Sequence, residues 1–225
     1  FAVSRTCFEG PEEMLRLTEN TQPAILTTSI AAFRVLETNL DVSPAFVAGH
    51  SLGEYSALVA AGSIGFTDAV RAVRERGRAM QRAVPAGEGA MAALMGVDRE
   101  TVVAICAEAS AGTGLASPAN YNAPGQTVIA GHRENVLKAI DLFRARGGRK
   151  AVELPVSAPF HCALMKPAAE RMEEVLGDIH IDSPETVLIN NAEAAFLTDA
   201  GQIAPSLVRQ VTSPVLWEDS IGALV

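Results

Sequence analysis

The chain has 225 residues, of which 48% are hydrophobic and 20% charged, as is usual for a globular protein of one or two domains. Its net charge of −8 argues against nonspecific binding of nucleic acid, and it has no apolar run of about 18 residues that would predict a membrane-spanning helix. Cys7, Cys106 and Cys162 form no CxxC pair, so we expect neither a disulfide framework nor a zinc site. These features favour a cytoplasmic protein with no membrane, nucleic-acid or metal partner.

The first part of the chain is predicted to contain three helices and one short strand. Thr21-Gln22-Pro23 is typical of a helix start, with proline in the first turn. The apolar segment 45–48 follows Pro44, is short, and is therefore predicted to be a buried strand. The predicted elements are a helix from 21 to about 40, a strand at 45–48, a helix at 54–61 and a helix at 68–84.

From Gly89 onward, short strands alternate with helices. The predicted elements are strand 90–97, helix 99–111, strands 115–122 and 127–131, helix 135–146 and strand 151–156. This β-α-β-β-α-β order indicates a ferredoxin-like subdomain. We therefore predict an α/β fold in which a large domain, 1–87 and 156–225, carries an insert at 88–155. The last part is predicted to hold a helix at 166–176, a strand at 186–190, a helix at 205–211 and a helix start near Trp217.

One serine lies at the junction between a predicted strand and a predicted helix. The sequence GHSLG at 49–53 has the G-x-S-x-G pattern of a nucleophile elbow. Glycine has no Cβ, so Gly49 and Gly53 permit a sharp turn on either side of Ser51. The N–H groups that begin the helix face a developing oxyanion, and the Leu52 N–H is the natural donor. The alternative is a glycine-rich turn with an idle serine, since short motifs give false positives.

A serine nucleophile needs a base, and the chain offers His50, His132, His161 and His180. His50 adjoins Ser51, and because neighbours on a strand point to opposite faces it can shape the turn but is a poor base. His161 lies in LPVSAPFHCALMKP, where a strand ends at a proline-containing loop before a helix, a place where catalytic groups concentrate. We favour His161 as the base. The alternative is a loop histidine that only caps the helix beginning at Lys166.

One arginine of the predicted helix 68–84 is turned inward. At about 100° per residue, with Val73 at the centre of the buried face, Arg76 lies about 60° from that centre. An inward arginine needs an anionic partner. Either an internal Asp or Glu supplies it, or a substrate carboxylate does, gripped by the planar guanidinium. The arginines expected on the solvated face are Arg71, Arg74, Arg78 and Arg82.

Four motifs of the chain resemble those of the malonyl-CoA:acyl carrier protein transacylases. They are GHSLGEYSALVAAG, RGRAMQRAVPAGEGAMAALMG, NYNAPGQTVIAG and PVSAPFHCALMKPA, in this order and spacing. The resemblance extends from about Glu9 to Trp217. It implies an α/β-hydrolase-like large domain with a ferredoxin-like insert, in agreement with the elements predicted above.

The resemblance implies roles for individual residues. Ser51 would be the acylated nucleophile and His161 its base, in a dyad that needs no third acid. Arg76 would bind the free carboxylate of the malonyl group. Phe160 resembles the residue type of malonyl-selective members, since members that take methylmalonyl often carry serine there. The residues predicted to bind substrate are Arg76, Leu52, His50, Met80, Asn122, Gln126 and Phe160, with Asn120 as a weaker candidate.

The resemblance also implies a reaction and its partners. A malonyl group would pass from malonyl-CoA to Ser51 and then to the phosphopantetheine thiol of acyl carrier protein, in fatty acid biosynthesis. The kinetics would be ping-pong, without a metal or bound cofactor, and we expect a monomer. The acyltransferase domain of a polyketide synthase is the alternative pathway assignment.

Two other classes of protein compete with this interpretation. A serine esterase or thioesterase would have the same elbow, but the chain lacks an HGGG-type oxyanion loop, and a neutral-ester hydrolase has no use for Arg76. A non-catalytic module that binds carrier protein is disfavoured because Ser51, Arg76 and His161 are all present.

Members of the family also carry segments that this sequence does not contain. They begin with a strand and a GQGSQ-type loop, whose glutamine region supplies the second oxyanion donor. They continue past the position of Val225 with another strand and a GPG-containing loop. The chain has no GQGSQ, so we expect it to be incomplete at both termini, with two central strands and one oxyanion donor outside it.

Overall fold

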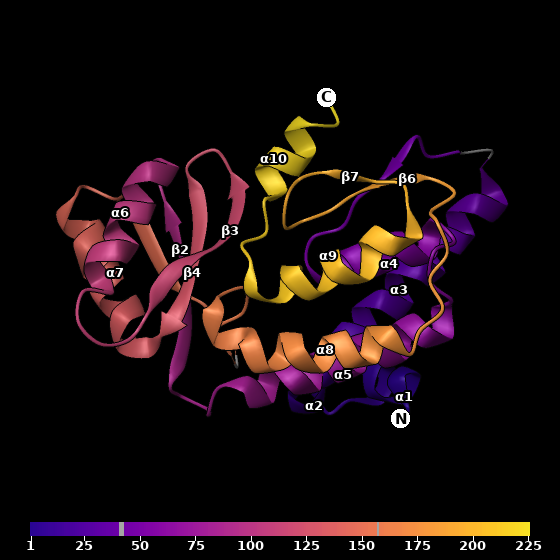
Figure 1. Ribbon diagram of the computed structural model, residues 1–225. Helices are drawn as coiled ribbons and strands as arrows, with labels where there is room; N and C mark the ends of the chain where they lie inside the picture. Colours follow the sequence, from indigo (N-terminus) through magenta and orange to yellow (C-terminus); the bar gives the residue numbers. More distant parts are fainter. Residues whose placement is uncertain (41–42, 157) are drawn as a thin grey trace. The chain divides into compact units, whose positions relative to one another are not determined.

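The computed structural model describes residues 1–40, 43–156 and 158–225, which form two compact units (Figure 1). Unit 1 comprises Phe1–Ala79 and Glu170–Val208, and unit 2 comprises Met80–Ala169 and Arg209–Val225. Ser157, which belongs to the motif PVSAPFHCALMKPA, lies outside the described residues.

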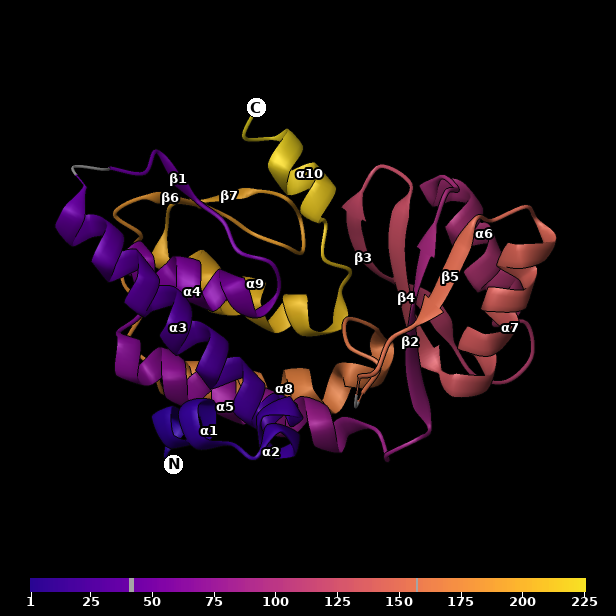
Figure 2. The ribbon, with the colours of Figure 1, turned by 180° about the vertical axis from the view of Figure 1, so that it is seen from behind.

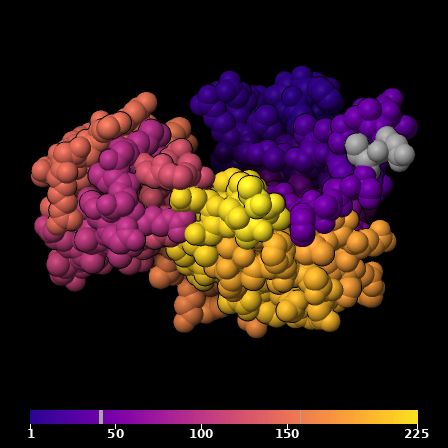
Figure 3. Space-filling view, turned by 90° about the horizontal axis from the view of Figure 1, so that it is seen from above, coloured from indigo at the N-terminus to yellow at the C-terminus, as the bar shows by residue number. Residues whose placement is uncertain are grey.

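Unit 1 consists of helices and a small sheet. The sheet has the order β1-β6-β7, with β1 parallel to β6 and β6 antiparallel to β7. Neither α1 nor α2 contains a buried residue, and Figure 3 shows the indigo N-terminal residues at the surface. The elements are α1 (Val3–Glu9), α2 (Glu12–Arg16), α3 (Thr18–Asn39), β1 (Phe46–Val47), α4 (Leu52–Ala60), α5 (Phe66–Ala83), α8 (Lys166–Gly177), β6 (Val187–Ile189), β7 (Phe196–Leu197) and α9 (Ala200–Thr212), of which α5, α8 and α9 continue into unit 2.

The pairing of β1 with β6 places two loops side by side. Phe46 pairs with Val187 and Val47 with Leu188 in a parallel register. The carboxyl ends of parallel neighbouring strands lie at the same edge of a sheet, where α/β proteins place their sites. The chain that leaves β1 therefore runs beside the chain that leaves β6.

Helix α5 follows its predicted pattern in part. Val73 is fully buried and Arg71 and Arg82 are exposed, as the helical spacing predicted. The prediction that Arg78 is solvated is wrong in part, because its Nε donates a hydrogen bond of 2.8 Å to the Glu19 carboxylate of α3. The packing of α3 beside this part of α5 covers a face that the sequence pattern assigned to solvent.

Unit 2 is built on a four-stranded sheet with the order β3-β4-β2-β5, in which each neighbouring pair is antiparallel. Figures 1 and 2 show α6 and α7 on the same face of this sheet. The elements of unit 2 are β2 (Gly89–Met95), α6 (Arg99–Ala109), β3 (Ala116–Ala123), β4 (Gln126–His132), α7 (Arg133–Ala145), β5 (Lys150–Glu153), the 3-10 helix η1 (Ala163–Met165) and α10 (Trp217–Gly222).

The sequence of β2 explains how this sheet is covered on both faces. Ala92 and Leu94 belong to the core cluster that includes α6 and α7. Met91 and Ala93 belong to a second cluster, which contains Cys162. Successive residues of a strand point to opposite faces, so the apolar run GAMAALM fits a strand that is buried on both sides.

Most predicted elements are confirmed, with small shifts at their ends, and so is the α/β class with two sheets. The prediction of a buried strand at 45–48 is wrong in part. The strand spans only Phe46–Val47 and Phe46 is exposed, because β1 is an edge strand that pairs with β6 alone. The sequence did not predict α1 and α2, which present no buried face, or the two-residue strand β7. Helix α9 begins at Ala200 rather than at Pro205. The reason is that the Asp199 carboxylate accepts the Gly201 N–H at 2.8 Å, so Pro205 lies inside the helix.

Candidate active site

Ser51 lies in a sharp turn between β1 and α4. Its backbone has φ 53° and ψ −103°, a conformation that is strained for a residue with a side chain. An added Cβ at Gly49 would lie 2.0 Å from the carbonyl carbon and oxygen of Gly53. The close approach of these two backbone segments therefore requires glycine at position 49. The strand–turn–helix geometry predicted for an elbow is present.

The second glycine of the motif has different surroundings. An added Cβ at Gly53 would meet no atom of the described residues within 4 Å, and its φ is not in the left-handed region. The prediction that the turn also needs glycine at position 53 is therefore not supported. It is the backbone of Gly53, rather than its missing side chain, that shapes the turn.

The beginning of α4 places backbone N–H groups beside Ser51. The Gly53 N–H donates to the His50 carbonyl oxygen at 2.9 Å. The Leu52 N–H has no hydrogen-bond partner among the described residues, so it is available to an oxyanion. The His50 side chain is exposed, which fits its expected role in the turn rather than as a base.

Arg76 of α5 is buried, with 2% of its surface exposed, and it reaches Ser51. Its Nη2 donates to Ser51 Oγ at 3.0 Å and its Nη1 to Gln22 Oε1 at 2.9 Å. Burial lowers the pKa of Arg76, and the nearby Glu54 opposes this effect. Burial also raises the pKa of Tyr55 to about 12, so its phenol is neutral. The predicted inward orientation of Arg76 is confirmed, and its charge lies beside the serine oxygen.

Gln22 is a site residue that the sequence analysis treated only as part of a helix start. It is buried in α3, and its Nε2 donates to Thr18 Oγ1 at 2.9 Å. This bond fixes the orientation of the amide, so that Oε1 faces Arg76. The sequence did not single out Gln22, because a polar residue directly before Pro23 is also typical of an ordinary helix start.

Asn191 and Glu54 are a second set that the sequence analysis missed. Both are buried, with 1% and 0% of their surfaces exposed. Asn191 Oδ1 accepts the Ser51 N–H at 2.5 Å, and Nδ2 donates to the Gly49 carbonyl oxygen at 2.9 Å. The Asn191 N–H donates to Glu54 Oε2 at 3.0 Å. The available signal was the pair Asn190-Asn191 at the end of the predicted strand 186–190.

His161 belongs to unit 2 and lies in the loop before η1, as the sequence predicted. It is buried, and its φ of 59° is unusual for a residue with a side chain. Its Nδ1 lies 2.9 Å from the carbonyl oxygen of Gln210. A carbonyl oxygen only accepts hydrogen bonds, so Nδ1 carries a proton, and in the neutral ring the lone pair is then on Nε2. This tautomer is the one that a general base needs.

The family model of the acyl transferase domain matches residues 1–223. The chain belongs to this acyl transferase family. The malonyl CoA-acyl carrier protein transacylase of Escherichia coli strain K12 is 49% identical over 213 residues, which cover 95% of this chain and 69% of the relative.

Solved structures of relatives have the same fold as this acyl transferase chain. The malonyl CoA-acyl carrier protein transacylase of Coxiella burnetii has a TM-score of 0.97 at 42% identity, over 99% of this chain and 70% of that one. A malonyl-transacylase solved in complex with a type II polyketide synthase acyl-carrier protein has a TM-score of 0.96 at 44% identity. The match covers 99% of this chain and 72% of that one.

The other predicted substrate-binding residues of this acyl transferase lie in unit 2. Met80 is buried near the end of α5. Asn122 and Gln126 are half-buried and flank the turn between β3 and β4. Phe160 is half-buried and packs against the cluster that contains Cys162. The structure thus places Ser51, Leu52, His50 and Arg76 in unit 1, and His161, Met80, Asn122, Gln126 and Phe160 in unit 2.

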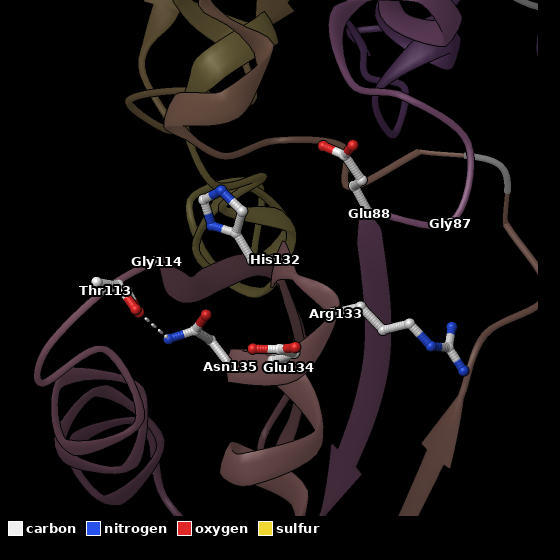
Figure 4. Close-up of a pocket in the computed structure, with 8 residues that line it drawn as sticks. All are labelled: Gly87, Glu88, Thr113, Gly114, His132, Arg133, Glu134 and Asn135. Carbon is white, nitrogen blue, oxygen red and sulfur yellow. Dashed lines mark hydrogen bonds between the residues drawn. The ribbon is translucent and has the colours of Figure 1, made fainter.

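A surface pocket of about 500 Å³ in unit 2 contains none of these residues (Figure 4). His132 Nδ1 accepts the Leu115 N–H at 2.9 Å, and Asn135 Nδ2 donates to the Thr113 carbonyl oxygen at 3.0 Å. These bonds tie the loop before β3 to the start of α7, which gives the polar groups a structural role. The pocket is lined by Gly87, Glu88, Thr113, Gly114, His132, Arg133, Glu134 and Asn135.

No group of three or more His, Cys, Asp or Glu residues in the described part of the chain is arranged to hold a metal ion. None of the helices in residues 1–40, 43–156 and 158–225 is both long enough and apolar enough to span a membrane.

Proposed function

We propose that the protein transfers a malonyl group from malonyl-CoA, through a seryl ester on Ser51, to the phosphopantetheine thiol of acyl carrier protein. The observation that carries the proposal is the hydrogen bond of 3.0 Å from the buried Arg76 guanidinium to Ser51 Oγ. In a malonyl group one methylene separates the acyl carbonyl from the carboxylate. A carboxylate held by Arg76 therefore brings the carbonyl to Ser51. The relatives named malonyl CoA-acyl carrier protein transacylase support the same reaction.

The charge of Arg76 gives a physical reason for selecting an anionic acyl group. The guanidinium is planar and can bind both oxygens of a carboxylate. Electrostatic attraction is stronger in a buried site than in water, because the effective dielectric constant is lower. A neutral acetyl group offers nothing to this cation, so a malonyl group is preferred.

In the first half-reaction, Ser51 Oγ attacks the thioester carbonyl carbon of malonyl-CoA. The C–O bond forms as the hydroxyl proton passes to Nε2 of His161, and the carbonyl electron pair moves onto its oxygen, which the Leu52 N–H stabilises. The tetrahedral intermediate then collapses, the C–S bond breaks, and His161 returns the proton to the departing sulfur. The products are malonyl-Ser51 and CoA.

In the second half-reaction, the phosphopantetheine thiol of acyl carrier protein attacks the malonyl-Ser51 ester. His161 takes the thiol proton, a C–S bond forms, and the C–O bond to Ser51 breaks. The proton then returns from His161 to Ser51 Oγ, which restores the enzyme. A covalent intermediate shared by two substrates predicts ping-pong kinetics.

The finer assignments of the site belong to the same proposal. His161 is the base, and the contact between its Nδ1 and the Gln210 carbonyl oxygen supports this role. Serine and histidine perform the transfer without a metal or cofactor. We assign the mouth of the site to Asn122 and Gln126, and selectivity for the malonyl group to Phe160. Leu52, His50 and Met80 complete the substrate-binding set.

The domain description is also a proposal. The order β3-β4-β2-β5 with α6 and α7 on one face supports a ferredoxin-like insert at 88–155. The parallel pairing of β1 with β6 and the elbow that follows β1 support an α/β-hydrolase-like large domain at 1–87 and 156–225. We further propose a cytoplasmic monomer that binds neither nucleic acid nor membrane, in keeping with the free Cys7, Cys106 and Cys162 and the net charge of −8.

We place the reaction in fatty acid biosynthesis. A polyketide pathway is the second candidate, favoured by the similarity to a transacylase solved with a type II polyketide synthase carrier protein. Comparing kcat/KM for carrier proteins of the two kinds tests this choice, since the natural acceptor should react more efficiently.

Mass spectrometry tests the proposed reaction directly. The protein is incubated with malonyl-CoA, and a malonyl adduct is expected on Ser51. Holo acyl carrier protein is then added, and the adduct should move to its phosphopantetheine. Release of malonate without transfer to the carrier protein would instead identify a thioesterase.

A further inference from the structure

We infer that Asn191 is a positioning residue for Ser51, and that the buried carboxylate of Glu54 holds Asn191 in place. The inference rests on the proposed role of Ser51 as nucleophile. The side chain of Asn191 bonds to the elbow on both sides of His50: Oδ1 accepts the Ser51 N–H at 2.5 Å, and Nδ2 donates to the Gly49 carbonyl oxygen at 2.9 Å.

These two bonds give the Asn191 amide one orientation. Its oxygen faces a donor and its nitrogen faces an acceptor, so a flipped amide would place like groups against each other. To form both bonds a side chain needs a donor and an acceptor, which asparagine carries on the same carbon, Cγ. Asn191 therefore binds both an N–H and a carbonyl oxygen of the turn, and it stabilises the one backbone conformation that presents them in this arrangement.

The turn needs such support because Ser51 is strained. Its φ of 53° and ψ of −103° lie outside the regions that residues with side chains favour. Strained backbone persists only where the surroundings over-determine it. Gly49 makes the turn possible by its close approach to Gly53, whereas Asn191 ties the two ends of the turn together.

The same bond also leaves one backbone donor for the reaction. Because the Ser51 N–H is engaged by Asn191 Oδ1, the first N–H of α4 that is open to an oxyanion is that of Leu52. Asn191 thus fixes both the nucleophilic oxygen and the donor beside it.

Glu54 connects this arrangement to α4. It lies in the first turn of that helix, is fully buried, and accepts the Asn191 N–H with Oε2 at 3.0 Å. The helix N-terminus favours a carboxylate at this position. Glu54 of α4 thus bonds to Asn191, and Asn191 bonds to Gly49 and Ser51, which directly precede α4.

The experiment compares two neighbouring buried asparagines. Asn191→Ala removes both bonds to the elbow. Asn190→Ala is the matched control, because Asn190 is equally buried but bonds to Ser206 Oγ at 2.8 Å and to the Ala195 N–H at 2.9 Å. We measure the rate of malonyl-Ser51 formation and the rate of Ser51 labelling by a fluorophosphonate, together with the midpoint of unfolding.

Asn191→Ala is expected to slow both reactions of Ser51 by about 100-fold, the effect of misplacing a reacting group by roughly 1 Å. Asn190→Ala is expected to lower the unfolding midpoint. Its rates of malonyl-Ser51 formation and of labelling should stay within about threefold of the parent, because Asn190 does not hold the reacting groups in place. Equal rate losses in the two variants, or a parent-like rate in Asn191→Ala, would overturn the inference.

Asn191→Asp supplies a readout that a purely structural role would not move. A protonated aspartate can accept the Ser51 N–H and donate to the Gly49 carbonyl oxygen, whereas the ionised form repels that oxygen. Burial raises the pKa of such a carboxyl. The labelling rate of Asn191→Asp relative to the parent should therefore rise as the pH falls from about 8 to about 5. The ratio for Asn191→Ala should stay flat.

A flat ratio for Asn191→Asp would contradict the donor role of Asn191.

Labelling by the fluorophosphonate separates this inference from the proposed function. A parent protein that reacts with the probe but gains no malonyl group would refute the malonyl transfer, and the asparagine comparison would still test the positioning of Ser51.

Discussion

Arg76 Nη2 donates a hydrogen bond of 3.0 Å to Ser51 Oγ, so a buried cation and the proposed nucleophile are direct neighbours. The guanidinium is held from the other side by Gln22 Oε1 at 2.9 Å. When a malonyl carboxylate binds, the Nη2 donor has to turn from the serine oxygen to the carboxylate. Selection of the acyl group and activation of the serine therefore depend on the same side chain.

Replacing Arg76 by alanine should reduce malonyl transfer far more than acetyl transfer. Only the malonyl group has a carboxylate for the guanidinium, and a charged hydrogen bond of this kind contributes about 1.5–3 kcal/mol, which corresponds to about 10- to 150-fold in rate. The measurement is the ratio of kcat/KM for malonyl-CoA and acetyl-CoA. The ratio is internally controlled, since a folding defect lowers both rates. An unchanged ratio would show that Arg76 has a structural role only.

Ser51→Ala should abolish malonyl labelling and leave the fold intact, because it removes one hydroxyl from a half-exposed turn. Labelling is followed by mass spectrometry of the intact protein and of its peptides, and folding by circular dichroism. A malonyl adduct on the Ser51→Ala protein at the parent's rate would disprove the assignment of the nucleophile.

Gly49→Ala and Gly53→Ala should differ in their effects on stability. A Cβ at position 49 would overlap the backbone of Gly53 at 2.0 Å, so the elbow must deform, whereas a Cβ at position 53 meets open space in the described residues. We expect Gly49→Ala to lower the free energy of unfolding by more than about 2 kcal/mol, as steric overlap in a core does. Gly53→Ala should change it by less than about 1 kcal/mol. Chemical denaturation of both variants checks this, and equal losses would contradict it.

Phe160→Ser should relax selectivity toward methylmalonyl-CoA. Phe160 directly precedes His161 and is half-buried, so a smaller side chain leaves room beside the base. The quantity to measure is the ratio of acylation rates with malonyl-CoA and methylmalonyl-CoA, in the variant and in the parent. Phe160→Leu is the control, because it keeps most of the volume. Identical discrimination in all three proteins would exclude Phe160 from selectivity.

Docking of acyl carrier protein should depend on basic residues around the end of α7. Arg144 and Arg146 are partly neutralised, because they pair with Asp141 and Glu108. Arg149 and Lys150 are exposed and form no ion pair within the described residues, so we expect them to contribute more. Reversing the charge of both should raise the KM for carrier protein, more strongly at low salt, where screening is weaker. The control is Arg5→Glu combined with Arg16→Glu, on α1 and α2, because it changes the net charge by the same amount. An unchanged KM in the Arg149 and Lys150 variant would place the docking surface elsewhere.

The elbow could be predicted from sequence because its causes are local. The chain enters the turn from an apolar segment and leaves it into α4, and Gly49 allows the backbone to approach Gly53. The inward direction of Arg76 was also predictable, since the helical period alone separates it from exposed arginines such as Arg71 and Arg82. The loop position of His161 followed from the end of one predicted strand and the start of one predicted helix.

The partners of these residues were decided by tertiary structure alone. Asn191 is 140 positions from Ser51, and Gln22 is 54 positions from Arg76. The first pair meets because β1 and β6 align in parallel register, and the second because α3 packs beside α5. A local pattern determines where one side chain points along its own helix or turn. It carries no information on which distant donor or acceptor will face that side chain, because this depends on how strands pair and helices pack.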